Sequence, residues 1–180
     1  KTITTIEGGF VCTDNKKTYE KLLYLRNQGR INRGTFIHPE IGYNFRMNDM
    51  QCAIGLKQLE KREYIFSRKK ENFDYYVKRL KNNKHLKIIF PKEQSGHVPF
   101  RVAIVFEKEQ NDVASFLAEN GIETRTFFYP LHKQPCFKYL DQDVLDDHFK
   151  ASNKLFDSGL CFPVYPDLTK EKIDYICDKI

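Results

Sequence analysis

Hydrophobic residues recur with helical spacing in several stretches of the chain, and two of these stretches are long. Asn48 is a favourable N-cap residue, and apolar residues cover most of the circumference of the helix that follows it. These residues are Met47, Met50, Cys52, Ala53, Ile54, Leu56 and Leu59. We expect this helix to be buried on several sides, against its own core or against a partner subunit. A second, amphipathic helix is predicted over 63–82, with a stripe of Phe66, Phe73, Tyr76, Val77 and Leu80.

Shorter patterns predict the remaining elements. Further helices are expected over about 17–28, from the N-cap Asn111, around 145–156 and after the N-cap Thr169. Strands are expected within 2–13, on both sides of a Glu-Gly-Gly turn, and over 86–90, 98–106 and 122–128. From residue 84 onward the order is strand, strand, helix, strand, helix, helix, which predicts a small α+β domain.

Composition narrows the classes of function. Apolar residues make up 41% of the 180 residues, which supports a packed core. The net charge of +6 favours anionic ligands, but cations alternate with acids and form no run of five. Nucleic acid is the first candidate for such a charge, but the mixed signs argue against it, and we expect no nucleic-acid partner. A phosphate-bearing small molecule fits the charge balance equally well. No stretch reaches 18 apolar residues, so no membrane span is predicted.

Cysteine and histidine spacing argues against a metal site. The five cysteines are scattered without a C-x-x-C pair, and the histidines form no H-E-x-x-H motif. Most of the cysteines lie among apolar neighbours, so we interpret them as small buried hydrophobic residues in a reducing, cytoplasmic environment.

Five residues are candidates for chemistry, and each also has an ordinary interpretation. Lys1 is either a solvated lysine or a Schiff-base lysine at the end of an element. Asn44 and Arg46 either form a turn and an ion pair or provide an anion site before a helix N-terminus. The aromatic run that contains Tyr129 and His132 is either a buried strand or the wall of a ligand pocket.

Four sequence blocks resemble the DegT/DnrJ/EryC1/StrS family of sugar aminotransferases. They are K-T-I-T-T-I-E-G-G at 1–9, the block I-G-Y-N-F-R-M-N-D with its helix at 41–60, G-I-E-T-R through H-K-Q-P at 121–135, and G-L-C-F-P-V-Y-P-D-L-T at 159–169. One departure is Ile6, where the family commonly has glycine. The resemblance implies an α/β architecture, the fold type I of pyridoxal-phosphate enzymes. The chain would be the C-terminal half of a longer protein that begins at the cofactor lysine.

The resemblance also implies domains and roles. Residues 1–47 would end the large cofactor-binding domain, 48–83 would be connecting and interface helices, and 84–180 would be the small C-terminal α+β domain. Lys1 would be the catalytic lysine that binds pyridoxal 5'-phosphate, and Asn44 would reach the cofactor phosphate across a homodimer interface. Arg46, Tyr129 and His132 would contact the substrate, and no metal is expected.

The implied reaction is transfer of an amino group from glutamate to a keto nucleotide-sugar. The block at 121–135 is most similar to perosamine-synthase-like enzymes of polysaccharide and O-antigen biosynthesis. This subgroup favours C4 of a GDP- or TDP-linked 4-keto-6-deoxyhexose. Two alternatives stay open, namely a family member with another regiochemistry such as C3, and a non-catalytic regulatory or interaction relative.

Overall fold

The computed structural model describes residues 1–32, 34, 36–91, 96–140 and 142–180, and it divides into two compact units. The N-terminal unit holds Lys1 and Ile3–Arg62, and the C-terminal unit holds Thr2 and Glu63–Ile180. The boundaries expected after residues 47 and 83 refer to domains of a longer protein, and they stay a prediction.

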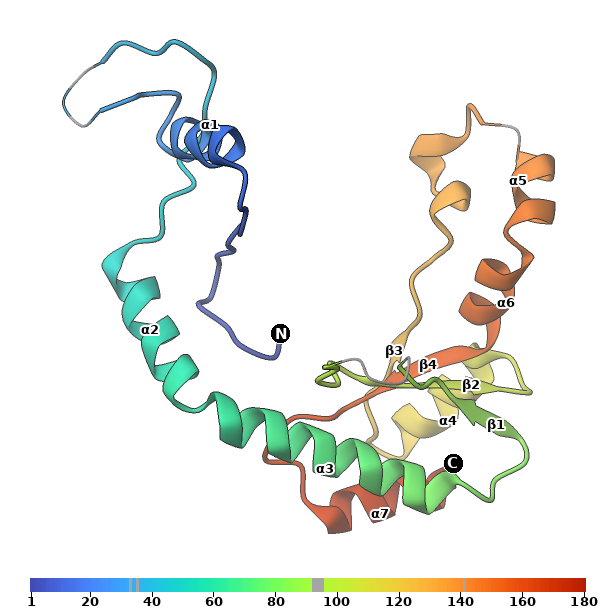
Figure 1. Ribbon diagram of the computed structural model, residues 1–180. Helices are drawn as coiled ribbons and strands as arrows, with labels where there is room; N and C mark the ends of the chain where they lie inside the picture. The colour runs from blue at the N-terminus through green and yellow to red at the C-terminus, as the bar shows by residue number, and fades with distance from the viewer. Residues whose placement is uncertain (33, 35, 92–95, 141) are drawn as a thin grey trace. The chain divides into compact units, whose positions relative to one another are not determined.

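The N-terminal unit contains two helices, α1 (Lys16–Arg26) and α2 (Asp49–Glu60) (Figure 1). Asn15 caps α1, because its side chain accepts a hydrogen bond of 3.0 Å from the Thr18 N–H. Asn48 caps α2 in a capping box with Gln51. The helices predicted at 17–28 and from Asn48 are therefore confirmed.

The two strands predicted within 2–13 are wrong. The structure describes all of this segment and places none of it in a strand. The Glu7 N–H donates to Thr5 O, the Ile6 N–H donates to Thr4 Oγ1, and the Thr5 hydroxyl donates to Glu7 O. These local bonds occupy backbone groups that a strand would use to pair with a neighbour.

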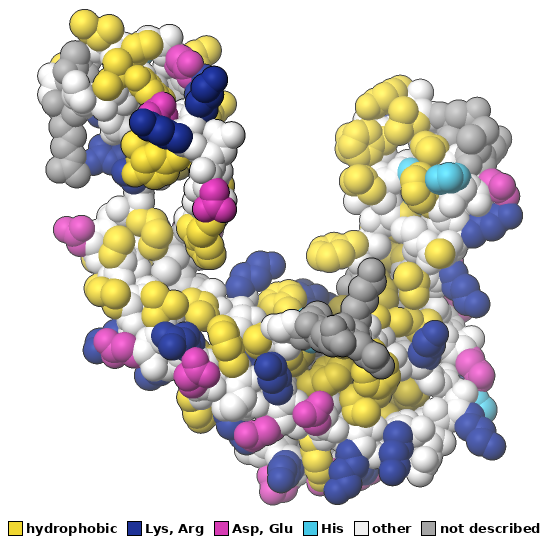
Figure 2. Space-filling model, viewed as in Figure 1, with side chains coloured by type: hydrophobic (Ala, Val, Ile, Leu, Met, Phe, Trp, Pro, Cys, Tyr) yellow, Lys and Arg dark blue, Asp and Glu magenta, His cyan; other side chains and the backbone are white. Residues whose placement is uncertain are grey.

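The helix α2 is not buried by the described residues of its own unit. None of its residues is buried, and Met50 and Leu56 keep 75% and 64% of their surface exposed. Figure 2 shows hydrophobic side chains in yellow over the surface of the unit that holds α1 and α2. Among the described residues, every buried hydrophobic side chain lies at Ile65 or later. Burial against a partner subunit stays a prediction.

The C-terminal unit combines helices with a small antiparallel sheet. Its antiparallel sheet has the order β1-β2-β4-β3. The strands are β1 (Leu86–Ile88), β2 (Val102–Phe106), β3 (Arg125–Thr126) and β4 (Gly159–Phe162). The helices are α3 (Arg62–Leu80), α4 (Gln110–Glu119), α5 (Gln142–His148), α6 (Lys150–Ser158) and α7 (Lys170–Lys179), with short 3-10 helices η1 (Leu131–Lys133) and η2 (Pro135–Phe137).

The core of this unit lies between α3, the sheet, α4 and α7. Side chains with no exposed surface come from each of these elements: Tyr76, Val102, Ile104, Leu117, Leu160 and Ile173. The predicted stripe of α3 is buried at Phe73, Tyr76 and Leu80. Thr169 caps α7 as expected, with its hydroxyl accepting from the Lys172 N–H.

Several predicted bounds in this unit are wrong. The strand expected over 98–106 begins at Val102, and the strand expected over 122–128 is limited to β3. One helix was expected at 145–156, but the backbone of Phe149 (φ −106°, ψ 30°) separates α5 from α6. The N-cap of α4 is Glu109 and not Asn111, which lies inside the helix.

The expectation of buried cysteines is wrong for three of the five. Cys12, Cys52 and Cys136 are exposed, whereas Cys177 is buried and Cys161 is partly buried. Burial raises the pKa of the Cys161 thiol, and it raises the pKa of Cys177 to about 11. Neither thiol is therefore activated as a nucleophile.

Candidate active site

Lys1 lies at the start of a rigid turn, and its side chain is exposed. The turn is closed by the Glu7 N–H bond to Thr5 O (2.9 Å) and by the Thr5 hydroxyl bond to Glu7 O (2.9 Å). Gly8 has a φ of +153°, and a Cβ there would lie 2.6 Å from Thr5 Oγ1. Position 8, where the chain leaves the turn, therefore requires a glycine.

Asn44 and Arg46 lie on a short extended segment that runs along the C-terminal end of α1. The Tyr43 N–H donates to Leu25 O (2.6 Å), the Phe45 N–H donates to Arg26 O (3.2 Å), and Asn44 forms a β-bridge with Asn27. Side chains alternate along extended backbone, so Asn44 and Arg46 lie on the side opposite Tyr43 and Phe45. The Tyr43 and Phe45 rings stack at 4.9 Å, which fixes their face and thereby the face of Asn44 and Arg46.

A pair of glycines makes this arrangement possible. Gly29 has a φ of +77°, and a Cβ there would lie 1.8 Å from Glu40 O. A Cβ on Gly42 would lie 2.1 Å from the Gly29 nitrogen. The chain that leads to Asn44 can therefore approach the end of α1 only without these side-chain atoms.

The lysine turn and the Asn44–Arg46 segment meet within the N-terminal unit. An ideal Cβ on Gly8 would lie 3.6 Å from Met47 Sδ, the residue directly after Arg46. Both Asn44 and Arg46 are exposed, and no hydrogen bond of their side chains is found within the described ranges. The carboxamide of Asn44 and the guanidinium of Arg46 are nitrogen donors, and such groups fit a phosphate-bearing ligand.

Tyr129 and His132 belong to the C-terminal unit. The Tyr129 ring packs edge-on against Phe156 of α6 at 5.1 Å and stays 45% exposed. His132 lies in η1, is 7% exposed, and packs against the Phe149 ring at 5.2 Å.

An acid that the sequence analysis missed holds His132. Asp146 of α5 contacts His132 Nε2 through Oδ1 at 2.8 Å, and its Oδ2 pairs with Lys133 Nζ at 3.3 Å. Asn153 of α6 adds a bond of 3.3 Å from Nδ2 to Asp146 Oδ1. The hydrogen bond from His132, followed by those from Lys133 and Asn153, lowers the pKa of Asp146. Asp146 stands 14 residues from His132, a spacing without a motif that could have indicated it.

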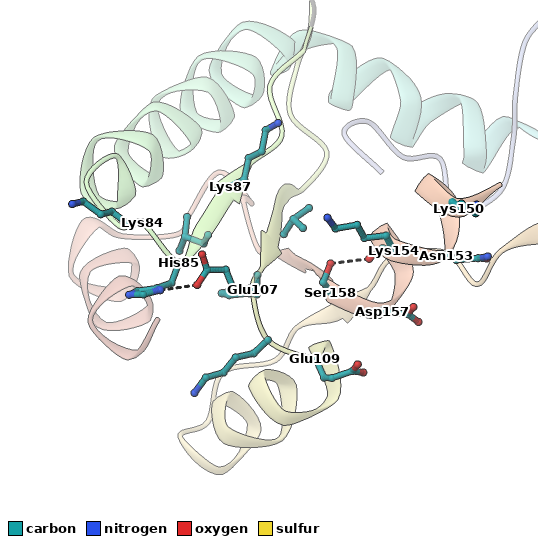
Figure 3. Close-up of a pocket in the computed structure, with 14 residues that line it drawn as sticks. Lys84, His85, Lys87, Glu107, Glu109, Lys150, Asn153, Lys154, Asp157 and Ser158 are labelled. Atoms are coloured by element: carbon teal, nitrogen blue, oxygen red, sulfur yellow. Dashed lines mark hydrogen bonds and ion pairs between the residues drawn. The ribbon is translucent and has the colours of Figure 1, made fainter. Parts of the chain in front are cut away.

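A cavity of about 790 Å³ lies elsewhere in the C-terminal unit, between β1, β2 and α6 (Figure 3). Exposed lysines form much of its wall, including Lys84, Lys87 and Lys154, beside a His85–Glu107 pair at 2.7 Å. None of the five predicted site residues lines it. Because these lysine side chains are flexible and their ammonium groups are hydrated, the cavity is a basic recess in the surface. It is separate from the candidate site.

The described part of the chain supports neither a metal site nor a membrane-spanning helix. No group of three or more His, Cys, Asp or Glu that could hold a metal ion is found there. No helix among the described residues is long and apolar enough to cross a membrane.

The fold is that of the sugar aminotransferases. A solved structure, PseC of Helicobacter pylori, described as an aminotransferase involved in the biosynthesis of pseudoaminic acid, matches with a TM-score of 0.87 at 24% identity. The match covers 99% of this chain and 49% of PseC. The sequence model of the DegT/DnrJ/EryC1/StrS aminotransferase family matches residues 1–180, and the chain belongs to this family.

Two relatives are similar over the whole chain. GDP-perosamine synthase of Escherichia coli O157:H7 is 36% identical over 184 residues, and GDP-perosamine synthase of Vibrio cholerae is 32% identical over 186 residues. These matches cover 100% of this chain but 48% and 49% of the two relatives. The chain thus spans about half the length of the curated relatives it matches.

Proposed function

We propose that the protein containing this chain is a pyridoxal-phosphate-dependent aminotransferase that moves an amino group from glutamate to a keto nucleotide-sugar. The acceptor carbon in this proposal is C4 of a GDP- or TDP-linked 4-keto-6-deoxyhexose. Membership of the family and the similarity to two GDP-perosamine synthases support it. The single observation that carries it is an exposed Lys1 ahead of a turn that hydrogen bonds and Gly8 hold rigid.

The cofactor, when bound, supplies the electron sink that stabilises negative charge on the substrate carbon. Lys1 Nζ would hold the cofactor, and its amine would serve as the base that moves a proton at the substrate carbon. Asn44 and Arg46 offer amide and guanidinium donors for the cofactor phosphate or the substrate diphosphate.

The C-terminal unit contributes residues for the sugar nucleotide. The half-exposed Tyr129 offers an aromatic face with a hydroxyl at its tip. His132 is buried and paired with Asp146, which supports a part in fixing the loop that carries Tyr129. A direct contact of His132 with the sugar stays a prediction.

The proposal includes a cytoplasmic homodimer with shared active sites. The exposed apolar residues of α2 supply a surface for a second subunit. The implied substrates, glutamate and a nucleotide-sugar, are metabolites of the cytoplasm.

The test uses the full-length protein loaded with pyridoxal phosphate. Lys1→Ala should abolish the visible absorption band of the lysine-bound cofactor and slow amino transfer by at least about 10²-fold, the lower bound for a lost general base. Lys16→Ala is the matched control, because Lys16 is an exposed lysine whose one ion-pair partner among the described residues is Glu20, at 3.9 Å. A wild-type protein without the band would contradict the enzyme and favour a non-catalytic relative.

The choice of sugar needs a second assay. Glutamate turnover is measured with GDP- and TDP-linked 4-keto-6-deoxy sugars and with a 3-keto sugar. Turnover of either 4-keto sugar supports the proposal, and inactivity on both with turnover of the 3-keto sugar overturns the assignment to C4.

A further inference from the structure

One face of α2 carries Gln51, Gly55 and Gln58, which lie at positions i, i+4 and i+7 of the helix. The segment after Lys1 contacts all three residues. Gln51 Nε2 donates to Glu7 O (3.1 Å), and Gln58 Oε1 accepts from the Thr4 N–H (3.4 Å). An ideal Cβ on Gly55 would lie 3.0 Å from Thr5 Cγ2, so glycine gives the turn room to lie on the helix.

The carboxamide of Gln51 serves two purposes with its two ends. Its Oε1 accepts from the Asn48 N–H (3.0 Å), which completes the capping box of α2. Its Nε2 is the donor to Glu7 O, which also accepts from the Thr5 hydroxyl. The side chain of Gln51 therefore links the N-terminal end of α2 to Glu7 of the turn.

The two contacts restrict where Lys1 stands. Thr4 is three residues from Lys1, and an extended chain spans at most about 3.3–3.6 Å per residue. An anchored Thr4 therefore keeps the backbone of Lys1 within about 11 Å of the backbone of Thr4. The second anchor at Glu7 fixes the direction in which the segment leaves the turn.

We propose that this face of α2 positions the cofactor lysine, with Gln51 as the positioning residue that sets the turn and Gln58 as the second anchor. The inference rests on the proposed function for the role of Lys1. The anchoring itself is a property of the fold without cofactor.

Substitutions at Gln51 separate anchoring from helix capping. Gln51→Glu keeps an acceptor for the Asn48 N–H, so the capping box stays, but a carboxylate cannot donate to Glu7 O. Gln51→Ala loses both bonds. If Gln51 only caps the helix, Gln51→Glu should behave as wild type.

Gln58 provides the matched control for the added charge. It accepts in its bond to Thr4, so Gln58→Glu keeps this bond while placing the same charge on the same helix face. Gln58→Leu removes the acceptor and the bond.

The experiment uses the full-length protein in two forms. Amide hydrogen exchange of the peptide covering residues 3–9 is measured without cofactor, and the pH midpoint of the visible band is measured with it. We expect the amides of residues 3–9 to exchange about fivefold faster in Gln51→Glu, Gln51→Ala and Gln58→Leu, because each variant removes one hydrogen bond to this segment. Their band midpoints should shift, whereas Gln58→Glu should keep the wild-type exchange rate.

The outcomes are distinguishable. Wild-type exchange and an unshifted midpoint in Gln51→Glu overturn the inference, even where Gln51→Ala is destabilised. Equal shifts in Gln51→Glu and Gln58→Glu also overturn it, because charge alone then explains them. A wild-type protein that lacks the band overturns the proposed function, and the exchange rates without cofactor still confirm or overturn the anchoring.

Discussion

At the scale of single residues, Ile6 has a backbone conformation that its side chain disfavours. Its φ of 70° lies in the left-handed region, where β-branched residues are outliers. The side chain is 76% exposed, so burial offers little compensation. Two hydrogen bonds maintain this strained conformation. The Ile6 N–H donates to Thr4 Oγ1, and the Glu7 N–H donates to Thr5 O.

Ile6→Gly should therefore stabilise the protein. Strain of about 1–3 kcal/mol is released, and the extra freedom of glycine in the unfolded chain costs about 0.5–1 kcal/mol. We expect a net gain of about 1 kcal/mol in the free energy of unfolding, measured by chemical denaturation.

The control is Ile6→Ala, which removes the branch but keeps a Cβ at positive φ. It should gain less than Ile6→Gly. An equal gain in the two variants would show that backbone strain at Ile6 is not the cause.

At the scale of elements, Asp146 joins three short helices, η1, α5 and α6. It contacts His132 and Lys133 of η1 from α5, and it accepts from Asn153 of α6. The loop with Tyr129 precedes η1 directly, so the acid also steadies part of the candidate site.

This junction should weaken in acid. The folded-state pKa of Asp146 is lowered below its unfolded value of about 3.9. The carboxylate thus stabilises the fold above that value, and its contribution is lost as pH falls through the folded pKa. Asp146→Asn should melt below wild type at neutral pH, and the difference should shrink toward about pH 3.

Asp157→Asn supplies the comparison. Asp157 is an exposed acid of the same region, and no partner of its side chain is found among the described residues. Melting temperatures across pH should show no comparable trend for it. A constant offset for Asp146→Asn at every pH would argue against the ionised acid.

Helix starts, which depend on neighbouring residues, can be predicted from the sequence. Strands that depend on pairing with distant segments cannot. Asn48 and Thr169 begin helices as expected, because a cap needs only the next three residues, although Asn111 lies inside α4. The inner strand β4 is not predicted from the sequence, because its four residues do not alternate between apolar and polar. They are extended because they pair with β2 on one side and β3 on the other.

The candidate site divides in the same way. The resemblance indicated Lys1, Asn44 and Arg46 through contiguous motifs. The roles of Gln51 and Asp146 depend on which side chains meet after folding, and sequence spacing does not encode those contacts.

At the scale of the whole molecule, the two units differ in how much apolar surface they cover. The C-terminal unit has a continuous core, whereas the described N-terminal unit buries no large hydrophobic side chain. Its α2 presents Met50, Leu56 and Leu59 to solvent. Such a surface on a small unit favours coverage by further protein.

Leu56→Asp tests this in the full-length protein. If a second subunit covers Leu56, a charge there should destabilise the assembly by about 2 kcal/mol or more. Sedimentation at several concentrations should show a shift toward the monomer.

Lys57→Gln is the neighbouring control on α2. Lys57 is exposed, and within the described ranges its ion-pair partner is Glu60 at 2.8 Å, so its loss should change stability by less than about 1 kcal/mol. If Leu56→Asp has the same small effect, Leu56 stays in solvent and the proposed interface lies elsewhere.

The contacts between α3 and the segment after β4 have a consequence for biosynthesis. Side chains of α3 reach backbone oxygens more than 90 residues away, through Lys69 to Val164, Asn72 to Tyr165 and Arg68 to Pro166. Closing a loop of this length costs about 4 kcal/mol of entropy before the contacts form. While the ribosome is still making the intervening residues, Phe73, Tyr76 and Leu80 have no partners from α7. A nascent chain therefore exposes the apolar face of α3 until α7 has emerged from the ribosome, and this interval is when chaperones would be needed.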